Sequence, residues 1–282
     1  MSPLSITGTT KFYALIGHPV QQVRTPTVLN AHLREHGIDA VMVTFNLLPA
    51  NLKDFFKMMK GWQNCLGCCV TIPHKTQTLQ LLDSFTERAR RIGAVNIIKR
   101  DAEGYLHGDM MDGLGFLAAL KKNNATVENK NIVLVGGGGA GSAIADSVAE
   151  AGAKQLSILE TNKNRQTNLI SNLRKIYPST SIYDQLVPGH SIDIVINASP
   201  LGMKVNDPLP FPLEKIKGSI VVADVVTKPD ITEFLKIASR AGHLIQRGRE
   251  MAEAQMSLFI DFMGIPKEAN NNLYLGVKKN AL

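Results

Sequence analysis

The fold is decided by one stretch of the chain, Asn131-Ile132-Val133-Leu134-Val135-Gly136-Gly137-Gly138-Gly139-Ala140-Gly141. An apolar run predicts a buried strand, and the small and apolar residues 140–150 after the glycines predict a helix. The glycines satisfy G-x-G-x-x-G, which permits a tight turn and a close backbone approach to a pyrophosphate held at the helix N-terminus. Strand, turn and helix together predict a Rossmann-type dinucleotide-binding unit. A flexible glycine turn without a ligand is the alternative.

The next expected strand, residues 155–159, ends at an acidic residue. Glu160 lies nineteen residues past Gly141, near the distance at which this fold places the acid that binds the adenosine ribose. A carboxylate accepts hydrogen bonds from the 2′-hydroxyl and repels a 2′-phosphate, so Glu160 favours NAD over NADP. Lys163 and Arg165 follow closely and offer partners to a 2′-phosphate, and a solvated glutamate at a strand end is a further alternative.

Strand-like and helix-like segments alternate on both sides of this unit. Strands are expected at residues 12–17, 41–45, 68–72, 94–98, 155–159, 192–196, 219–223 and 243–246. Helices are expected at residues 26–36, 52–60, 140–151, 163–176 and 249–263. The pattern predicts an α/β protein of two domains. Residues 1–111 form a substrate-binding, catalytic domain with a largely parallel sheet, residues 112–248 form the Rossmann domain, and C-terminal helices within 249–282 complete the first domain.

Composition limits the class of protein. The 282 residues are 44% hydrophobic, enough for packed cores. No apolar run reaches the roughly 20 residues that a membrane span needs, and the N-terminus lacks a signal-peptide pattern, so we expect a cytoplasmic protein. The net charge of +7 is scattered rather than gathered in a patch, which argues against a nucleic-acid partner. Cys65, Cys68 and Cys69 lie in a strand-like apolar run without a second ligand pair, so we expect reduced core cysteines and no metal site.

Polar groups follow the strands of the first domain. Lys75 comes after the strand that ends near Ile72, and Asp112 lies in the segment 108–113. Ligands of open α/β sheets bind beyond the carboxyl ends of strands, so these two side chains are expected to meet in one cleft. An alcohol dehydrogenase needs a group that takes or gives the hydroxyl proton, and a lysine beside a carboxylate supplies it. Two ordinary surface residues are the alternative.

At these residues the sequence resembles the shikimate/quinate dehydrogenase family. The family motifs occur here in the same order. In the first half of the chain, G-x-P is matched by Gly17-His18-Pro19, S-x-S-P by Val23-Arg24-Thr25-Pro26, N-V-T-x-P-x-K by Cys69-Val70-Thr71-Ile72-Pro73-His74-Lys75, G-A-V-N by Gly93-Ala94-Val95-Asn96, and G-D-N-T-D-G by Gly108-Asp109-Met110-Met111-Asp112-Gly113. Later in the chain, I-N-A-T-x-x-G-M is matched by Ile196-Asn197-Ala198-Ser199-Pro200-Leu201-Gly202-Met203, D-x-x-Y-x-P-x-x-T by Asp224-Val225-Val226-Thr227-Lys228-Pro229-Asp230-Ile231-Thr232, and G-x-x-M-L-x-x-Q by Gly248-Arg249-Glu250-Met251-Ala252-Glu253-Ala254-Gln255.

The resemblance implies an NAD(P)-dependent enzyme that interconverts a ring hydroxyl and a ketone of a shikimate- or quinate-like acid, as a monomer or homodimer. It implies that Lys75 transfers the proton and that Asp112 is its partner on the substrate hydroxyl. Further implied substrate positions are Thr25 at the carboxylate, Thr71, Asn96 and Gln255 at the hydroxyls, and the pocket residues Val23 and Thr227. Implied cofactor positions are Gly136, Gly138, Gly139, Ala140, Gly141, Glu160, Asn197, Ser199, Gly248 and Met251.

The chain departs from the family at five of these positions. Val23 and Thr227 stand in place of a serine and a tyrosine, Cys69 and Met110 in place of asparagines, and Met111 in place of a threonine. Losing a hydrogen bond to a charged group costs about 1.5–3 kcal/mol, so shikimate itself is expected to be a poor substrate. Thr25 and Glu160 are typical of NAD-using quinate dehydrogenases. A ligand-binding regulator that has lost turnover is the alternative function.

Overall fold

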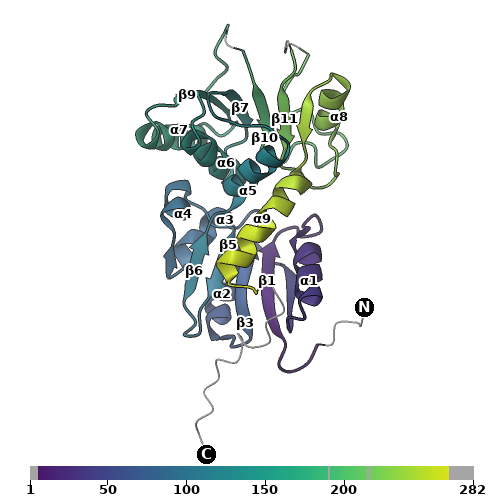
Figure 1. Cartoon of the computed structure of the whole chain (residues 1–282). Coiled ribbons are helices and arrows are strands. Elements are labelled where there is room, and N and C mark those ends of the chain that lie inside the picture. The colour runs from purple at the N-terminus through teal and green to yellow at the C-terminus, as the bar shows by residue number, and fades with distance from the viewer. Residues whose placement is uncertain (1–5, 190, 215, 217, 267–282) are drawn as a thin grey trace, which may run out of the picture.

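The computed structural model describes residues 6–189, 191–214, 216 and 218–266. Two six-stranded sheets form the centres of a lower and an upper layer (Figure 1). The part of the predicted C-terminal helical segment at residues 267–282 lies outside the described residues. Among the described helices, none has the length and apolar character needed to cross a membrane.

The first sheet is mixed rather than uniformly parallel. Its strand order is β2-β1-β3-β5-β6-β4. The strands are β1 (Lys11–Gly17), β2 (Ala40–Asn46), β3 (Cys65–Val70), β4 (Ser84–Phe85), β5 (Ile97–Arg100) and β6 (Leu106–Asp109). The β1–β2, β1–β3 and β4–β6 pairs are parallel, whereas β5 runs antiparallel to both β3 and β6. The link between β5 and β6 is too short for a crossover, so these two strands form a hairpin.

Helices cover both faces of this sheet. They are α1 (Thr25–Glu35), α2 (Leu52–Gly61), α3 (Lys75–Thr78) and α4 (Glu87–Ile92), with short 3-10 turns at Pro49–Asn51 and Leu79–Leu81. Alternate residues of β1 enter different cores: Tyr13 packs with α1, and Ala14 packs with α2. This is the period-two pattern of a strand that is buried on both faces.

The three cysteines are free and buried in β3, as predicted. Burial raises the pKa of the Cys65 thiol to about 11 and that of Cys69 to about 12. Burial also raises the pKa of Cys68. All three are therefore packing residues in the thiol form.

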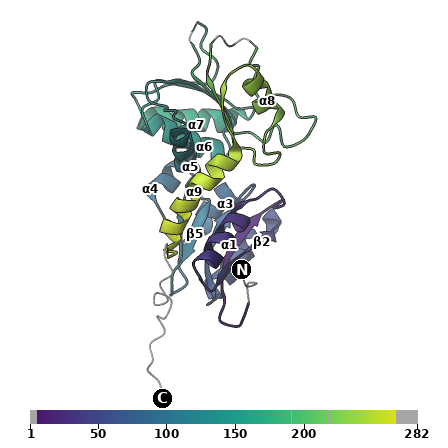
Figure 2. The ribbon, with the colours of Figure 1, turned by 45° about the vertical axis from the view of Figure 1, so that its right-hand side comes forward.

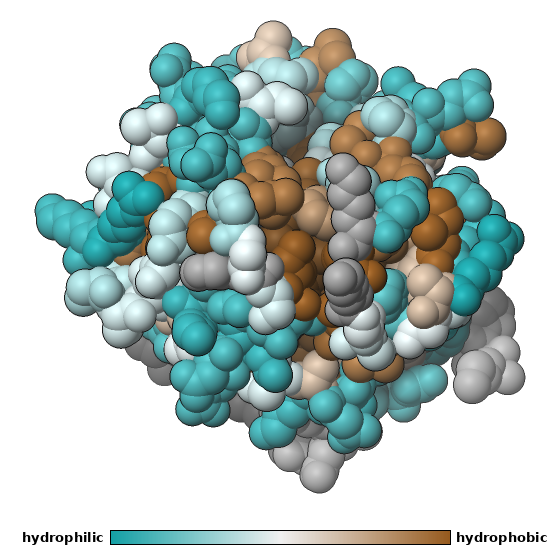
Figure 3. Space-filling model, turned by 90° about the horizontal axis from the view of Figure 1, so that it is seen from above, coloured by the Kyte–Doolittle hydropathy of each residue, from teal (hydrophilic) through white to brown (hydrophobic). Residues whose placement is uncertain are grey.

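The second sheet is fully parallel, with the order β12-β11-β10-β7-β8-β9. Its strands are β7 (Asn131–Val135), β8 (Gln155–Leu159), β9 (Ser181–Tyr183), β10 (Ile194–Asn197), β11 (Val221–Asp224) and β12 (Leu244–Gln246). Helices α6 (Gly139–Glu150), α7 (Lys163–Ile176) and α8 (Glu233–Arg240) pack on it. This is the doubly wound order, whose ligand crevice lies between the two central strands, here β7 and β10. Seen from above, apolar side chains gather centrally and hydrophilic ones lie round the margin (Figure 3).

Two helices join the layers. Helix α5 (Asp112–Lys122) packs against α9 (Gly248–Met263) and against α6. Helix α9 runs from the second sheet down to the first, beside α5 (Figure 2). Its Met251 enters the core of the second sheet, whereas Phe259 and Ile260 enter a core of the first. The two layers thus share α9.

Candidate active site

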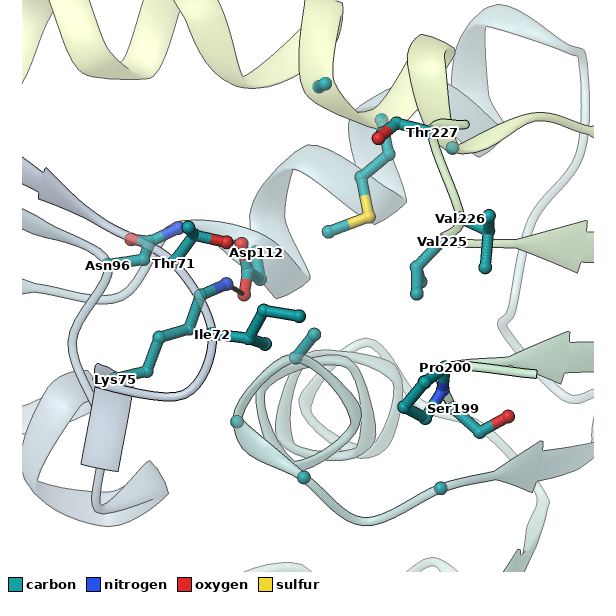
Figure 4. Close-up of a pocket in the computed structure, with 18 of the residues that line it drawn as sticks. Thr71, Ile72, Lys75, Asn96, Asp112, Ser199, Pro200, Val225, Val226 and Thr227 are labelled. Carbon is teal, nitrogen blue, oxygen red and sulfur yellow. Dashed lines mark hydrogen bonds and ion pairs between the residues drawn. The ribbon is translucent and has the colours of Figure 1, made fainter. Parts of the chain in front are cut away.

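One cavity of about 560 Å³ lies between the layers and is lined by residues of both. The side chains of Thr71, Lys75 and Asp112 face it from the first layer (Figure 4). Ser199 and Thr227 lie across the opening, on the second layer. The cavity therefore lies at the carboxyl ends of the strands, where the sequence predicts the cleft.

Lys75 and Asp112 meet in this cavity, as predicted. Lys75 begins α3 after β3, and Asp112 begins α5 after β6. Strands β3 and β6 run in the same direction on either side of β5, so their carboxyl ends lie at the same edge of the sheet and present the two side chains to each other. Lys75 Nζ lies 2.5 Å from Asp112 Oδ2, and their side chains are 13% and 5% exposed. An amine and a carboxylate at this distance form a hydrogen-bonded ion pair, which can exchange a proton with a bound oxygen.

The second oxygen of Asp112 is held by two amides. Asn96 Nδ2 donates to Asp112 Oδ1 over 2.8 Å, and Gln255 Nε2 donates to the same oxygen over 3.2 Å. Asn96 Oδ1 in turn accepts the backbone N–H of Met111 at 2.9 Å. The carboxylate plane is therefore fixed before any ligand binds. Two of the predicted substrate-binding residues, Asn96 and Gln255, already contact Asp112.

A buried ion pair fixes the backbone that leads to Asp112. Arg88 Nη2 lies 2.5 Å from Asp109 Oδ2, and Arg88 Nε donates to the Met110 carbonyl at 2.9 Å. Thr86 Oγ1 donates to Asp109 Oδ1. Met110 and Met111 turn into apolar cores and do not line the cavity. These two departures from the family are therefore changes of packing in this structure, whereas Cys69, Val23 and Thr227 do line the cavity.

The glycine turn lies against the side chain of Lys75. A Cβ added at Gly139 would lie 3.3 Å from Lys75 Cβ. Gly136 has φ of +98°, a conformation that favours glycine. A Cβ at Gly141 would lie 2.0 Å from the Gly136 carbonyl oxygen, so this glycine lets α6 pack on the turn. Gly136, Gly138, Gly139 and Ala140 line the cavity, whereas Gly141 does not.

Glu160 also lines the cavity and faces the turn. Its Oε2 accepts the Gly137 N–H at 2.8 Å and lies 3.2 Å from Arg165 Nη1, and its Oε1 accepts the Asn162 N–H at 2.8 Å. Burial acts to raise the pKa of Glu160, but the N–H donors and the Arg165 charge outweigh it and hold this pKa below its ordinary value. Glu160 is thus a carboxylate with a side chain only 6% exposed, ionised at neutral pH, beside the glycine turn.

The facing wall is organised by a fully buried amide. Asn197 Nδ2 donates to the Leu201 carbonyl and to Asp224 Oδ1, and its Oδ1 accepts from the backbone and hydroxyl of Ser199. Asn197 does not line the cavity, although it is a predicted cofactor position. It shapes the 197–203 loop. The predicted positions Ser199, Gly248 and Met251 do line the cavity.

Part of the lining carries no role that the sequence implies. These residues include Leu15, Gln22, Arg24, Ile72, Leu201, Met203, Val225, Val226, Ala252 and Phe259. All of them except Leu15, Gln22 and Phe259 stand inside the motifs and could have been found as neighbours of the assigned positions. Leu15 and Phe259 follow ordinary core patterns, and no local signal marks them.

Comparisons with known proteins agree with this geometry. A family profile described as the shikimate dehydrogenase substrate binding domain matches residues 15–98. A shikimate dehydrogenase (NADP(+)) of Methanobrevibacter smithii is 35% identical over 245 residues, which is 84% of this chain and 85% of that protein.

Solved structures share the whole fold. A shikimate dehydrogenase in complex with NADP+ is 32% identical, with a TM-score of 0.83 over 93% of each chain. A 5-ketofructose reductase of Gluconobacter is 30% identical, with a TM-score of 0.79 over 90% of this chain and 92% of that one. A quinate dehydrogenase of Corynebacterium glutamicum in complex with NAD is 26% identical, with a TM-score of 0.80 over 91% of this chain and 94% of that one.

Proposed function

The chain belongs to the shikimate dehydrogenase family, and from this we propose that it is an NAD(P)-dependent dehydrogenase that interconverts a ring hydroxyl and a ketone of a shikimate- or quinate-like acid. The single observation that carries the proposal is the Lys75–Asp112 pair, 2.5 Å apart and set against the glycine turn. No finding favours a regulator without turnover.

In this proposal, the substrate hydroxyl lies between Lys75 Nζ and Asp112. Neutral Lys75 takes the hydroxyl proton when the alcohol is oxidised, and protonated Lys75 returns a proton to the oxygen when the ketone is reduced. Asp112 accepts a hydrogen bond from the Lys75 amine, holds that amine against the hydroxyl and stabilises the ammonium that forms, because Asn96 and Gln255 fix the other carboxylate oxygen. When bound, the nicotinamide accepts or supplies the hydride. Thr71 and Thr25 add hydroxyls to the substrate pocket.

We also propose that NAD is preferred to NADP. The turn fits a dinucleotide, because Gly136, Gly138 and Gly139 keep side chains off the surface where a pyrophosphate meets the N-terminus of α6. The ionised Glu160 beside this turn can accept a ribose hydroxyl and repels a 2′-phosphate. Arg165 and Lys163 are the residues that could offset this repulsion. The Arg165 guanidinium is already paired with Glu160, and Lys163 donates to Gln166 Oε1 and does not line the cavity.

The direct test is an assay of nicotinamide reduction with quinate and with shikimate. We expect turnover, with kcat/KM at least about tenfold higher for NAD than for NADP, because a phosphate beside a carboxylate costs on the order of 1.4 kcal/mol or more. Lys75→Ala should lower kcat by about a hundredfold or more and leave the Kd of NAD unchanged. Lys57→Ala, which removes an exposed lysine of α2, is the matched control. Full turnover by Lys75→Ala would contradict the assigned role.

Two further predictions accompany this function. The three free, buried cysteines fit a reducing compartment, so we propose a cytoplasmic location. A monomer or a homodimer remains the predicted assembly, which light scattering of the purified protein would decide.

A further inference from the structure

We propose that Arg24 binds the carboxylate of the substrate and thereby sets the specificity of this enzyme for an acid. The inference rests on the proposed function, since it concerns the substrate of the same cleft. It goes beyond the motif positions, because Arg24 occupies the variable place between Val23 and Thr25.

Three cavity residues stand at pocket positions that the resemblance implies near the carboxylate. Thr25 offers one neutral hydroxyl, whereas Val23 and Thr227 offer no free donor. Val23 has no polar group and packs against the core that contains Phe259. Thr227 has a hydroxyl, but its Oγ1 donates to the backbone carbonyl of Gln22 at 3.2 Å. That hydrogen bond joins the two walls of the cavity and occupies the only proton of the Thr227 hydroxyl. Neither residue is therefore available to hold a charged oxygen.

The charges that line the cavity identify the group that remains. Lys75, Arg165 and Arg24 are its basic residues. Lys75 is paired with Asp112, and Arg165 is paired with Glu160. In the part of the chain that the structure describes, Arg24 has no acidic partner within ion-pair distance, whereas the other two do. An anionic ligand would therefore find its uncompensated positive charge at Arg24.

The backbone leaves the Arg24 side chain free for this role. Arg24 precedes the first turn of α1, and its side chain makes no capping hydrogen bond. It lies two residues from Gln22, whose carbonyl meets Thr227 across the cleft. Thr25, next to it, also lines the cavity and offers a hydroxyl. A guanidinium presents two parallel N–H donors to a carboxylate, which a lysine cannot match.

The test compares an acid with its neutral isostere. Arg24→Gln and unchanged protein are assayed with quinate and with quinate carboxamide, at saturating NAD. We expect the KM for quinate to rise about tenfold to a hundredfold, as for loss of a charged hydrogen bond, with kcat changed by less than about threefold. The KM for the carboxamide should be unchanged, and Arg24→Lys should restore part of the binding of quinate. Arg34→Gln, which removes an exposed arginine from the far end of α1, is the matched control and should behave as unchanged protein.

Each opposing result has a distinct meaning. An unchanged KM for quinate in Arg24→Gln, or an equal rise for quinate and its carboxamide, would overturn the role of Arg24 while the proposed function stands. Turnover of neither quinate nor shikimate by the unchanged protein would overturn the proposed function. A lower KM for a neutral ketose such as 5-ketofructose than for either acid would overturn the inference that the cleft selects a carboxylate.

Discussion

Asp224 shows how a single buried residue supports the cleft without touching a ligand. Its side chain ends β11 and is 2% exposed. Oδ1 accepts from Asn197 Nδ2 and from the Val226 N–H, and Oδ2 accepts from Thr232 Oγ1. Burial raises the pKa of Asp224 to about 6, even though these three hydrogen bonds act to lower it. Asp224 therefore fixes the loop that follows Asn197 and the loop between residues 224 and 232. Its burial costs free energy when the carboxylate is ionised.

This raised pKa predicts a loss of stability with rising pH. The ordinary pKa is 3.8, so between about pH 4 and about pH 6 the folded protein binds the Asp224 proton more tightly than the unfolded chain. The stability from this proton is complete below about pH 4 and is lost as pH rises through about 6. It amounts to about 1.4 kcal/mol for each unit by which the pKa is raised.

The contribution of the Asp224 proton to the free energy of unfolding can be measured by urea unfolding. Unchanged protein and Asp224→Asn are compared at several pH values between 4 and 7. The variant cannot titrate at this position, so unchanged protein should lose stability relative to it as the pH rises. Glu103→Gln, at an exposed carboxylate, is the control and should give a constant difference. If the free energies of unfolding of unchanged protein and of Asp224→Asn changed in parallel with pH, Asp224 would not titrate in this range.

At the scale of elements, α5 and α6 touch at a glycine next to the proposed catalytic carboxylate. A Cβ added at Gly113 would lie 2.2 Å from the Ala143 carbonyl oxygen and 2.1 Å from Ser147 Oγ. Both contacts belong to α6, and the first is to backbone that cannot rotate away. Helix α5 can therefore place Asp112 only while residue 113 has no side chain.

Gly113→Ala should force α5 away from α6. Overpacking of this kind costs about 1–3 kcal/mol, and because Asp112 is adjacent, kcat should fall as well. Chemical denaturation and the dehydrogenase assay measure the two effects. Gly61→Ala is the matched control, because this helical glycine of α2 has open space around it and should be neutral or slightly stabilising. Equal stability of both variants would mean that α5 and α6 can move apart at this contact with little loss of stability.

At the scale of the whole molecule, an ion-pair network joins the two layers behind the cleft. Arg91 of α4 lies 3.0 Å from Asp146 Oδ2 and 3.1 Å from Glu150 Oε1, both on α6. Asp146 is 3% exposed and also accepts the Tyr177 hydroxyl at 2.9 Å. Burial and the charge of Asp146 raise the pKa of Tyr177, which therefore stays protonated and donates. The network and the Thr227–Gln22 hydrogen bond link the same two layers at different places.

Arg91→Met should leave the Asp146 carboxylate buried without its countercharge. We expect a loss of about 3 kcal/mol in the free energy of unfolding, at the lower end of the range for a broken buried pair. Arg90→Met is the matched control. It removes a neighbouring arginine of α4 that is 61% exposed and paired with the exposed Glu87, and it should cost well under 1 kcal/mol. A similar loss in both variants would show that the Arg91 network adds no specific stability.

The sequence by itself determined five of the six strands of the second sheet, all except β9, and part of the cleft. Strands β7 and β8 and helix α7 begin and end at the predicted residues, because an apolar run and the glycines around it are local signals. The predicted meeting of Lys75 and Asp112 is confirmed, since both follow strands whose carboxyl ends lie at the same edge of one sheet, on either side of β5. Their chemical roles, like those of the other site residues, remain predictions.

Only the tertiary structure decided the rest. Strands β4 and β6 are too short to carry a pattern, and β4 pairs with β6 rather than with a strand next to it in the sequence. Met110 and Met111 occupy substrate-motif positions yet turn into cores, while Arg24 at a variable position lines the cavity. Local sequence reports which residues prefer a strand, a turn or a helix. Which side chains face one cavity depends on how two sheets and the shared helix α9 pack, and those contacts join residues that no local pattern connects.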